Sequence, residues 1–105
     1  MENNQKEIIW TKTAIKDLNK IYEFNIPIFG EGKSFEYIVA LTNEINLLEE
    51  GFIGIGVKYI SKRHPEIEYR KLISSHYLII YRAKGKRVYI NKIFDTRQSP
   101  KKLKI

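Results

Sequence analysis

The spacing of apolar residues changes once along this 105-residue chain, near Gly51, and that change is the strongest constraint on its fold. Before Gly51, apolar residues recur every three or four positions, which is the period of an amphipathic helix. After it, they alternate at every second position, which is typical of half-buried strands. We therefore expect a helical first part and a strand-rich second part that share one core.

The first part predicts one strand and two helices. Glu7 to Trp10 is short and apolar, as in a strand. The hydroxyl of Thr11 or Thr13 can cap the helix that follows, and Pro27 and Gly30 are expected to end it. This helix has one apolar face, formed by Ala14, Leu18, Ile21 and Tyr22.

A second helix is predicted from about Lys33 to Glu49, with Gly51 as a terminator just past its end. The break between the two helices is short, so they should form an antiparallel hairpin. Each helix has a single apolar stripe, and the pair therefore needs a sheet to cover.

The second part predicts a short strand and a meander. The short strand lies around Val57 to Ile60, and the meander consists of Glu68 to Ile73, His76 to Arg82, and Arg87 to Phe94. Turns are expected at Ser74-Ser75 and at Lys84-Gly85-Lys86, where Gly85 can adopt a positive φ. The main elements follow the order β-α-α-β-β-β. They predict one α+β domain over residues 1–105, in which a curved antiparallel sheet, made of the N-terminal strand and the C-terminal meander, packs against the helical hairpin. The sheet face away from the helices should stay open.

Charge is distributed unevenly between the two parts. Residues 1–57 carry a net charge of −4 and residues 58–105 carry +11, which together give the overall +7. A basic half of this kind favours nucleic acid, a phosphate-bearing site or an acidic protein segment as a partner. The alternative is a solvated surface that only aids solubility.

Composition excludes several kinds of site. The chain has no cysteine, so a disulfide, a thiolate metal site and a cysteine nucleophile are ruled out. Its two histidines are far apart, and we expect neither a metal nor a cofactor. No apolar run approaches the roughly 20 residues of a membrane span, and the polar N-terminus does not resemble a signal peptide. A cytoplasmic location is the expectation.

Basic and aromatic side chains gather in the predicted sheet. Tyrosines beside cations could stack on bases while the cations bind phosphate. The alternative is that the basic side chains only extend along the sheet surface and the tyrosines fill core volume. The candidates for binding are Arg70, Tyr77, Tyr81 and Lys92, and those for catalysis are Lys71, Arg82 and Arg97.

The order of elements and several motifs resemble the RelE/ParE superfamily of bacterial type II toxin–antitoxin systems. The motifs are Ile9-Trp10-Thr11, Tyr69-Arg70-Lys71-Leu72, Tyr77-Leu78-Ile79-Ile80-Tyr81, Val88-Tyr89-Ile90, and Ile93 through Pro100 with its Arg97-Gln98-Ser99-Pro100 ending. The resemblance implies a growth-arresting toxin that an antitoxin neutralises. RelE-like members cut messenger RNA at the ribosome, whereas ParE-like members poison DNA gyrase.

Two departures favour the ParE-like alternative. Lys71 and Arg97 match basic positions of RelE-like members, but Leu78 stands where an arginine is expected, and the tail after Arg97 lacks the expected Tyr or His. A leucine cannot stabilise charge that develops on a phosphate. His76 is better placed as an exposed structural residue than as a substitute general acid or base.

The leading hypothesis is therefore a non-enzymatic toxin that binds a macromolecular target, possibly DNA gyrase. Two alternatives stay open: a ribosome-dependent endoribonuclease that uses Lys71, Arg82 and Arg97, and an inactive relative kept as a binding module. The expected partners are a cognate antitoxin and either gyrase or ribosome-bound message, with no membrane. The toxin could form a homodimer or a hetero-oligomer with its antitoxin.

Overall fold

The computed structural model describes residues 6–50, 57–103 and 105, which fold into two helices and a five-stranded sheet. Strand β1 (Glu7–Trp10) is followed by helices α1 (Lys12–Phe29) and α2 (Glu31–Asn46) and by the 3-10 turn η1 (Leu47–Glu50). The remaining elements are β2 (Val57–Tyr59), β3 (Tyr69–Ser74), β4 (Tyr77–Lys84), β5 (Arg87–Asp95) and the 3-10 turn η3 (Pro100–Lys102). The α+β class and the helical hairpin are confirmed.

The direction of one strand differs from the expectation of an antiparallel sheet. The strand order is β1-β5-β4-β3-β2, and the three pairs from β5 to β2 are antiparallel. Strand β1, however, runs parallel to β5, with Ile8 opposite Val88. The sheet is therefore mixed. Residue alternation could not reveal this, because a strand alternates in the same way whichever direction it runs.

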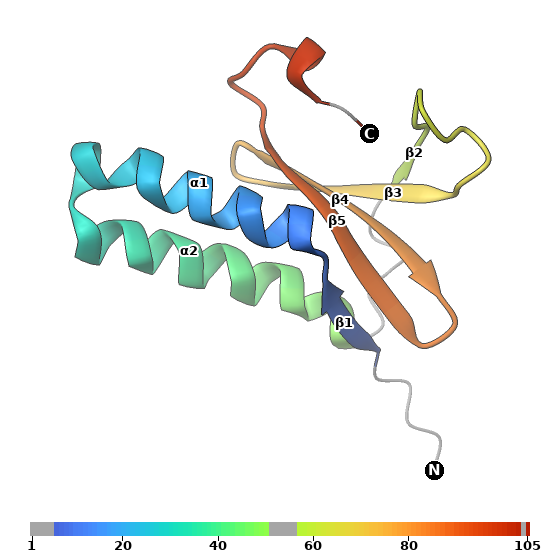
Figure 1. The fold of residues 1–105 in the computed structure, drawn as a ribbon. Helices are drawn as coiled ribbons and strands as arrows, with labels where there is room; N and C mark the ends of the chain where they lie inside the picture. The colour runs from blue at the N-terminus through green and yellow to red at the C-terminus, as the bar shows by residue number, and fades with distance from the viewer. Residues whose placement is uncertain (1–5, 51–56, 104) are drawn as a thin grey trace.

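The helical hairpin covers one face of the sheet (Figure 1). We call this the helix face. It is formed by Tyr77, Ile79, Tyr81, Val88, Ile90 and Ile93, which pack with Ala14, Leu41, Ile45 and Leu48 in one core cluster. Nine of these ten side chains are no more than 5% exposed, and only Tyr77, at 9%, is above that value. Burial of apolar side chains in this layer stabilises the fold. The turn end of the hairpin reaches beyond the sheet (Figure 1).

A β-bulge in β5 decides which of its side chains reach the core. Tyr81 lies opposite Ile90, whereas the preceding Ile80 lies opposite Lys92, so Asn91 is the extra residue. The extra residue reverses the alternation, and Ile93 joins Val88 and Ile90 on the helix face. Without the bulge, strict alternation from Val88 and Ile90 would place Ile93 on the opposite face.

Thr11, the residue between β1 and α1, forms the next hydrogen bonds to β5 where the pairing of β1 with β5 ends. Beyond Ile90, no strand formed by the described residues pairs with β5 on its β1 side. The backbone N–H and the hydroxyl of Thr11 both donate to the Ile90 carbonyl, at 3.2 and 2.7 Å. The same hydroxyl oxygen accepts a hydrogen bond from the Ala14 N–H. Of the two cap residues that the sequence allows, Thr11 and Thr13, Thr11 is therefore the one that caps α1.

Several element boundaries differ from the prediction by a few residues. Pro27 does not end α1, which continues to Phe29 and stops at Gly30, where φ is +84°. Pro27 lies in the last turn, where its missing N–H removes one helical bond only. The β3–β4 turn is centred on Ser75 and His76 rather than on Ser74 and Ser75. The predicted terminator Gly51 lies outside the described residues.

Candidate functional site

Two of the three candidate catalytic cations lie on the sheet face opposite the helices. We call this the outer face. Lys71 pairs across the sheet with Ile80, and Arg82 pairs with Tyr89. Because Tyr81 points into the core, its neighbours Ile80 and Arg82 point the other way. Lys71 and Arg82 are thus diagonal neighbours on adjacent strands, at a spacing of roughly 7–8 Å between backbone positions.

The outer face is less open than the sequence predicts. Three large side chains on it are buried, namely Tyr69 at 6%, Ile80 at 0% and Phe94 at 7% exposure. The segment after β5 curls back toward the sheet instead of running away from it (Figure 1). Lys71, Arg82 and Tyr89 stay partly exposed around these buried residues.

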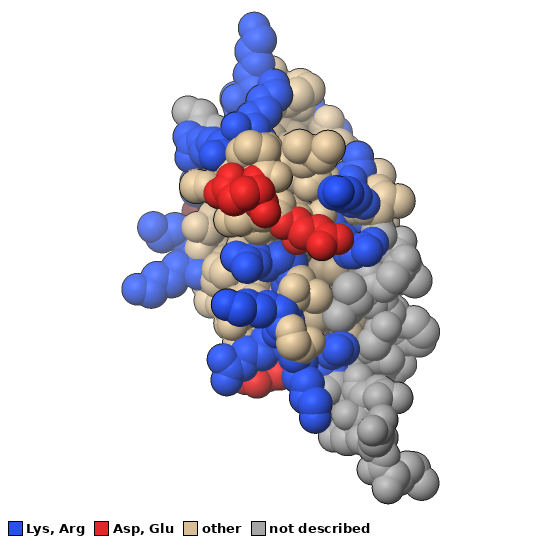
Figure 2. Space-filling model, turned by 90° about the vertical axis from the view of Figure 1, so that its right-hand side faces the viewer, with Lys and Arg blue, Asp and Glu red and all other residues tan. Residues whose placement is uncertain are grey.

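A basic surface surrounds the outer face. Figure 2 shows lysine and arginine side chains spread over this side of the molecule, with few acidic side chains between them. Arg87 makes an ion pair with Glu7 at 3.5 Å. Hydrogen bonding to Tyr89 and the charge of Glu7 raise the pKa of Arg87. Between residues 57 and 87 the exposed cations are Lys58, Lys62, Arg63, Lys84, Lys86 and Arg87. Of these, Lys58 pairs with Arg70 and so lies on the helix face.

The third candidate, Arg97, belongs to a different cluster at the end of β5. Its Nε lies 3.0 Å from Asp95 Oδ1, and its Nη2 lies 2.7 Å from Oδ2, so the guanidinium binds the carboxylate in a bidentate manner. The Arg97 backbone N–H also donates to Oδ1, at 2.9 Å. Hydrogen bonding from Arg97 holds the pKa of Asp95 below its usual value, and the carboxylate in turn raises the pKa of Arg97.

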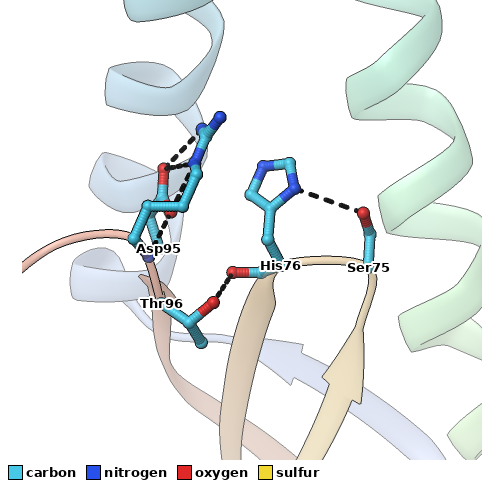
Figure 3. A network of polar contacts seen from close by, with 5 residues as sticks. Ser75, His76, Asp95 and Thr96 are labelled. Atoms are coloured by element: carbon cyan, nitrogen blue, oxygen red, sulfur yellow. Dashed lines mark hydrogen bonds and ion pairs between the residues drawn. The ribbon is translucent and has the colours of Figure 1, made fainter.

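The β3–β4 turn completes this cluster (Figure 3). The hydroxyl of Thr96 donates to the His76 carbonyl at 2.7 Å, which ties the end of β5 to the turn. His76 Nδ1 lies 3.2 Å from Ser75 Oγ, and the imidazole lies against the Tyr77 ring, with 4.2 Å between ring centroids. His76 is half-buried rather than exposed as predicted, and its Nε2 is buried without a hydrogen-bond partner among the residues that the structure describes.

The structure therefore separates the three candidate catalytic residues. Lys71 and Arg82 share the outer face, whereas Arg97 lies with Tyr77 and with α1 and α2 residues around a common cavity. Leu78 also lies on the outer face, opposite Phe94 and next to Ile80 along that face of β4, and it contributes no ionisable group. The three cations therefore do not form one cluster: Arg97 is paired with Asp95 beyond the end of β5, away from the face that Lys71 and Arg82 share.

The predicted binding residues are divided as well. Tyr81 is fully buried and Tyr77 is 9% exposed, and both belong to the core cluster, so neither ring can stack on a base. Their burial agrees with the alternative interpretation, in which these tyrosines fill core volume. Arg70 lies opposite Tyr81 on the helix face, with Nη2 4.0 Å from Glu68. Lys92 lies opposite Ile80, but its ammonium bonds to Asp17 of α1.

Asp17 is not among the site residues predicted from the sequence, and it is not one of the apolar residues that define the predicted buried face of α1. Asp17 is only 7% exposed, and its carboxylate receives Lys92 Nζ and the Ile93 backbone N–H, each at 3.0 Å. A signal was present, since Asp17 is three residues after the buried Ala14 and so shares its helix face.

Two cavities adjoin at the cluster around Arg97, and both are lined by Tyr77 and Arg97. The larger measures about 740 Å³ and is lined by cations that include Lys20, Lys92 and Lys102. The smaller measures about 380 Å³, and its walls include Phe29, Tyr37, Leu41 and His76. Residues from α1, α2, the β3–β4 turn and the C-terminal segment thus meet around one groove.

The described residues include no group of three or more His, Cys, Asp or Glu side chains placed to hold a metal ion. None of the helices formed by the described residues has the length and apolar character needed to cross a membrane.

Comparison with known proteins places the chain in a family. The model of the ParE toxin of the type II toxin–antitoxin system parDE matches residues 8–100. Among solved structures, the chromosomal ParDE toxin–antitoxin system from P. aeruginosa superposes with a TM-score of 0.71 at 22% sequence identity, over 87% of this chain and 96% of that one. No curated protein matches. The chain belongs to the ParE toxin family of type II toxin–antitoxin systems.

Proposed function

We propose that this protein arrests growth by binding DNA gyrase in the cytoplasm, without cutting nucleic acid, and that a cognate antitoxin neutralises it. The separation of the candidate catalytic residues carries the proposal. Lys71 and Arg82 lie on the outer face, whereas Arg97 is held by Asp95 beyond the end of β5, where it lines the two cavities. Cleavage would need a base, an acid and a charge-stabilising group around one phosphate.

The outer face suits binding to a macromolecule. It combines Lys71 and Arg82 with a ring of exposed cations, and the second part of the chain carries a net charge of +11. Such a surface attracts acidic or phosphate-bearing partners and accelerates their encounter. Membership of the ParE toxin family makes gyrase the first target to test.

A supercoiling assay tests the proposal directly. Purified toxin at micromolar concentration is added to DNA gyrase and relaxed plasmid, and we expect supercoiling to stop. Full supercoiling at that concentration would contradict the proposal. The matched control is a toxin denatured by heat before addition, which should leave gyrase active.

A translation assay tests the alternative function of ribosome-dependent cleavage. Toxin is added to a translating extract, and message is examined for cuts at the ribosome. We expect intact message. Cuts that disappear in Lys71→Ala and Arg97→Ala proteins would establish the nuclease instead.

Expression of the toxin without its antitoxin tests the third alternative, an inactive relative. Normal growth despite well-folded toxin would favour a repurposed binding module.

A further inference from the structure

We propose that the groove formed by the two adjoining cavities binds a partner peptide with one large apolar side chain between acidic residues, and that the apolar side chain enters the smaller cavity. The inference rests on the proposed function, in which a protein antitoxin binds the toxin. It adds the place of contact and the chemistry of the contacting segment.

The smaller cavity fits an apolar side chain. Its volume of about 380 Å³ lies between the two helices and the β3–β4 turn. Phe29 and Tyr37 meet edge to face across the helical hairpin, with 5.3 Å between ring centroids, and both line the cavity. They are 48% and 43% exposed, which leaves large aromatic surface uncovered. Covering such surface favours association by about 25 cal/mol per Å² of apolar area.

His76 supplies a polar contact inside the same cavity. Its Nε2 is buried without a partner, and a buried polar group without a hydrogen bond is costly. If the Ser75 hydroxyl donates to Nδ1, Nε2 carries the proton and requires an acceptor. A carbonyl oxygen of a bound peptide provides that acceptor.

The larger cavity explains the acidic residues of the peptide. It is lined by Lys20, Lys92, Arg97 and Lys102, against Asp17 and Asp95. Both carboxylates are already engaged, by Lys92 and Arg97 respectively. Among the described residues, neither Lys20 nor Lys102 has an acidic partner, and both are exposed. The cavity therefore retains an excess of positive charge. In the smaller cavity, Glu44 accepts a hydrogen bond from Ser74 and is likewise engaged.

Peptide titration of the purified toxin tests the inference. The probe is the acetylated and amidated pentapeptide Glu-Glu-Phe-Glu-Glu, whose near-symmetric sequence presents similar chemistry in either chain direction. Two further peptides replace every Glu by Gln, or Phe by Ala. In amide NMR spectra we expect the probe to shift resonances of residues that line the two cavities. We expect the Ala peptide to bind more than about tenfold more weakly, because the apolar anchor is lost, and the Gln peptide to bind about fivefold more weakly.

Matched toxin variants locate the site. Ala40→Leu fills the smaller cavity from α2, and Lys20→Glu with Lys102→Glu reverses the free charges of the larger one. Both variants should weaken probe binding at least about fivefold. The controls are Asn43→Leu and the pair Lys12→Glu with Lys16→Glu, which are exposed helix positions that line neither cavity. They should bind the probe as the wild type does.

Three outcomes overturn the inference: no binding at millimolar probe, equal binding of the three peptides, or shifts confined to the outer face. None of them depends on toxicity, since the titration uses purified toxin alone. A toxin that arrests growth but ignores the probe contradicts this inference only. One that binds the probe but leaves growth and gyrase unaffected contradicts the proposed function only.

Discussion

Lys92 of β5 and Asp17 of α1 form an ion pair, with Nζ 3.0 Å from Oδ1, at the point where the sheet loses its edge strand. The other carboxylate oxygen of Asp17 accepts the Ile93 N–H at 3.0 Å. One buried carboxylate thus satisfies both a backbone donor of β5 and a cation beside the bulge at Asn91. Helix α1 is thereby fixed against the sheet at the wall of the larger cavity, which Asp17 lines.

Replacing Asp17 should destabilise the fold strongly. Asp17→Ala leaves the partly buried Lys92 ammonium and the Ile93 N–H without their acceptor, and we expect a loss of about 2–4 kcal/mol in the free energy of unfolding. Urea denaturation followed by circular dichroism measures it. The neighbouring exposed Lys16→Ala is the control and should change the free energy by less than about 0.5 kcal/mol. A loss as small as that for Asp17→Ala would show that the contact is not structural.

The cap of α1 gives a second test with an internal control. Thr11→Ala removes the acceptor for Ala14 N–H and the donor to the Ile90 carbonyl. We expect it to cost about 1–2 kcal/mol. Thr13→Ala changes the same residue type two positions on, at an exposed site, and should be nearly neutral. Equal effects of the two substitutions on the denaturation midpoint would contradict the assignment of the cap.

The ion pair between Asp95 and Arg97 should stabilise the protein in a pH-dependent way. Hydrogen bonding from Arg97 lowers the pKa of Asp95 in the folded state. Its contribution is therefore present above the unfolded pKa of about 3.9 and is lost as pH falls through the lower folded value. We expect wild type to be more stable than Asp95→Asn at pH 7, with the difference shrinking below about pH 4. Thermal melts across this range measure the difference, and one that stayed constant would argue against the ion pair as its source.

The outer face should be required for toxicity but not for folding. Lys71→Glu with Arg82→Glu reverses two neighbouring charges at partly exposed positions. We expect at least about tenfold more of this variant to be needed to inhibit gyrase, because a rim of like charge repels an acidic partner. Lys12→Glu with Lys16→Glu makes the same charge change on α1 and should inhibit normally. Equal inhibition by both double variants would move the target-binding surface elsewhere.

The sequence alone predicted the helices, the strands and the family. The change of period at Gly51, the expectation of a Thr11 or Thr13 cap and the alternation in the meander are local properties, and each depends on residues close together in the chain. The motifs from Tyr69 to Pro100 were enough to identify the RelE/ParE superfamily.

Tertiary structure decided which predicted residues meet. The bulge at Asn91 depends on how β5 pairs with β4. The parallel course of β1 and the burial of Asp17 depend on contacts between residues more than 70 positions apart, such as Asp17 with Ile93. Such contacts leave no period in the sequence. Alternation along β4 shows that Tyr77 and Tyr81 share a face, but it does not show which face is buried. The packing of α1 and α2 on that face makes both tyrosines core residues.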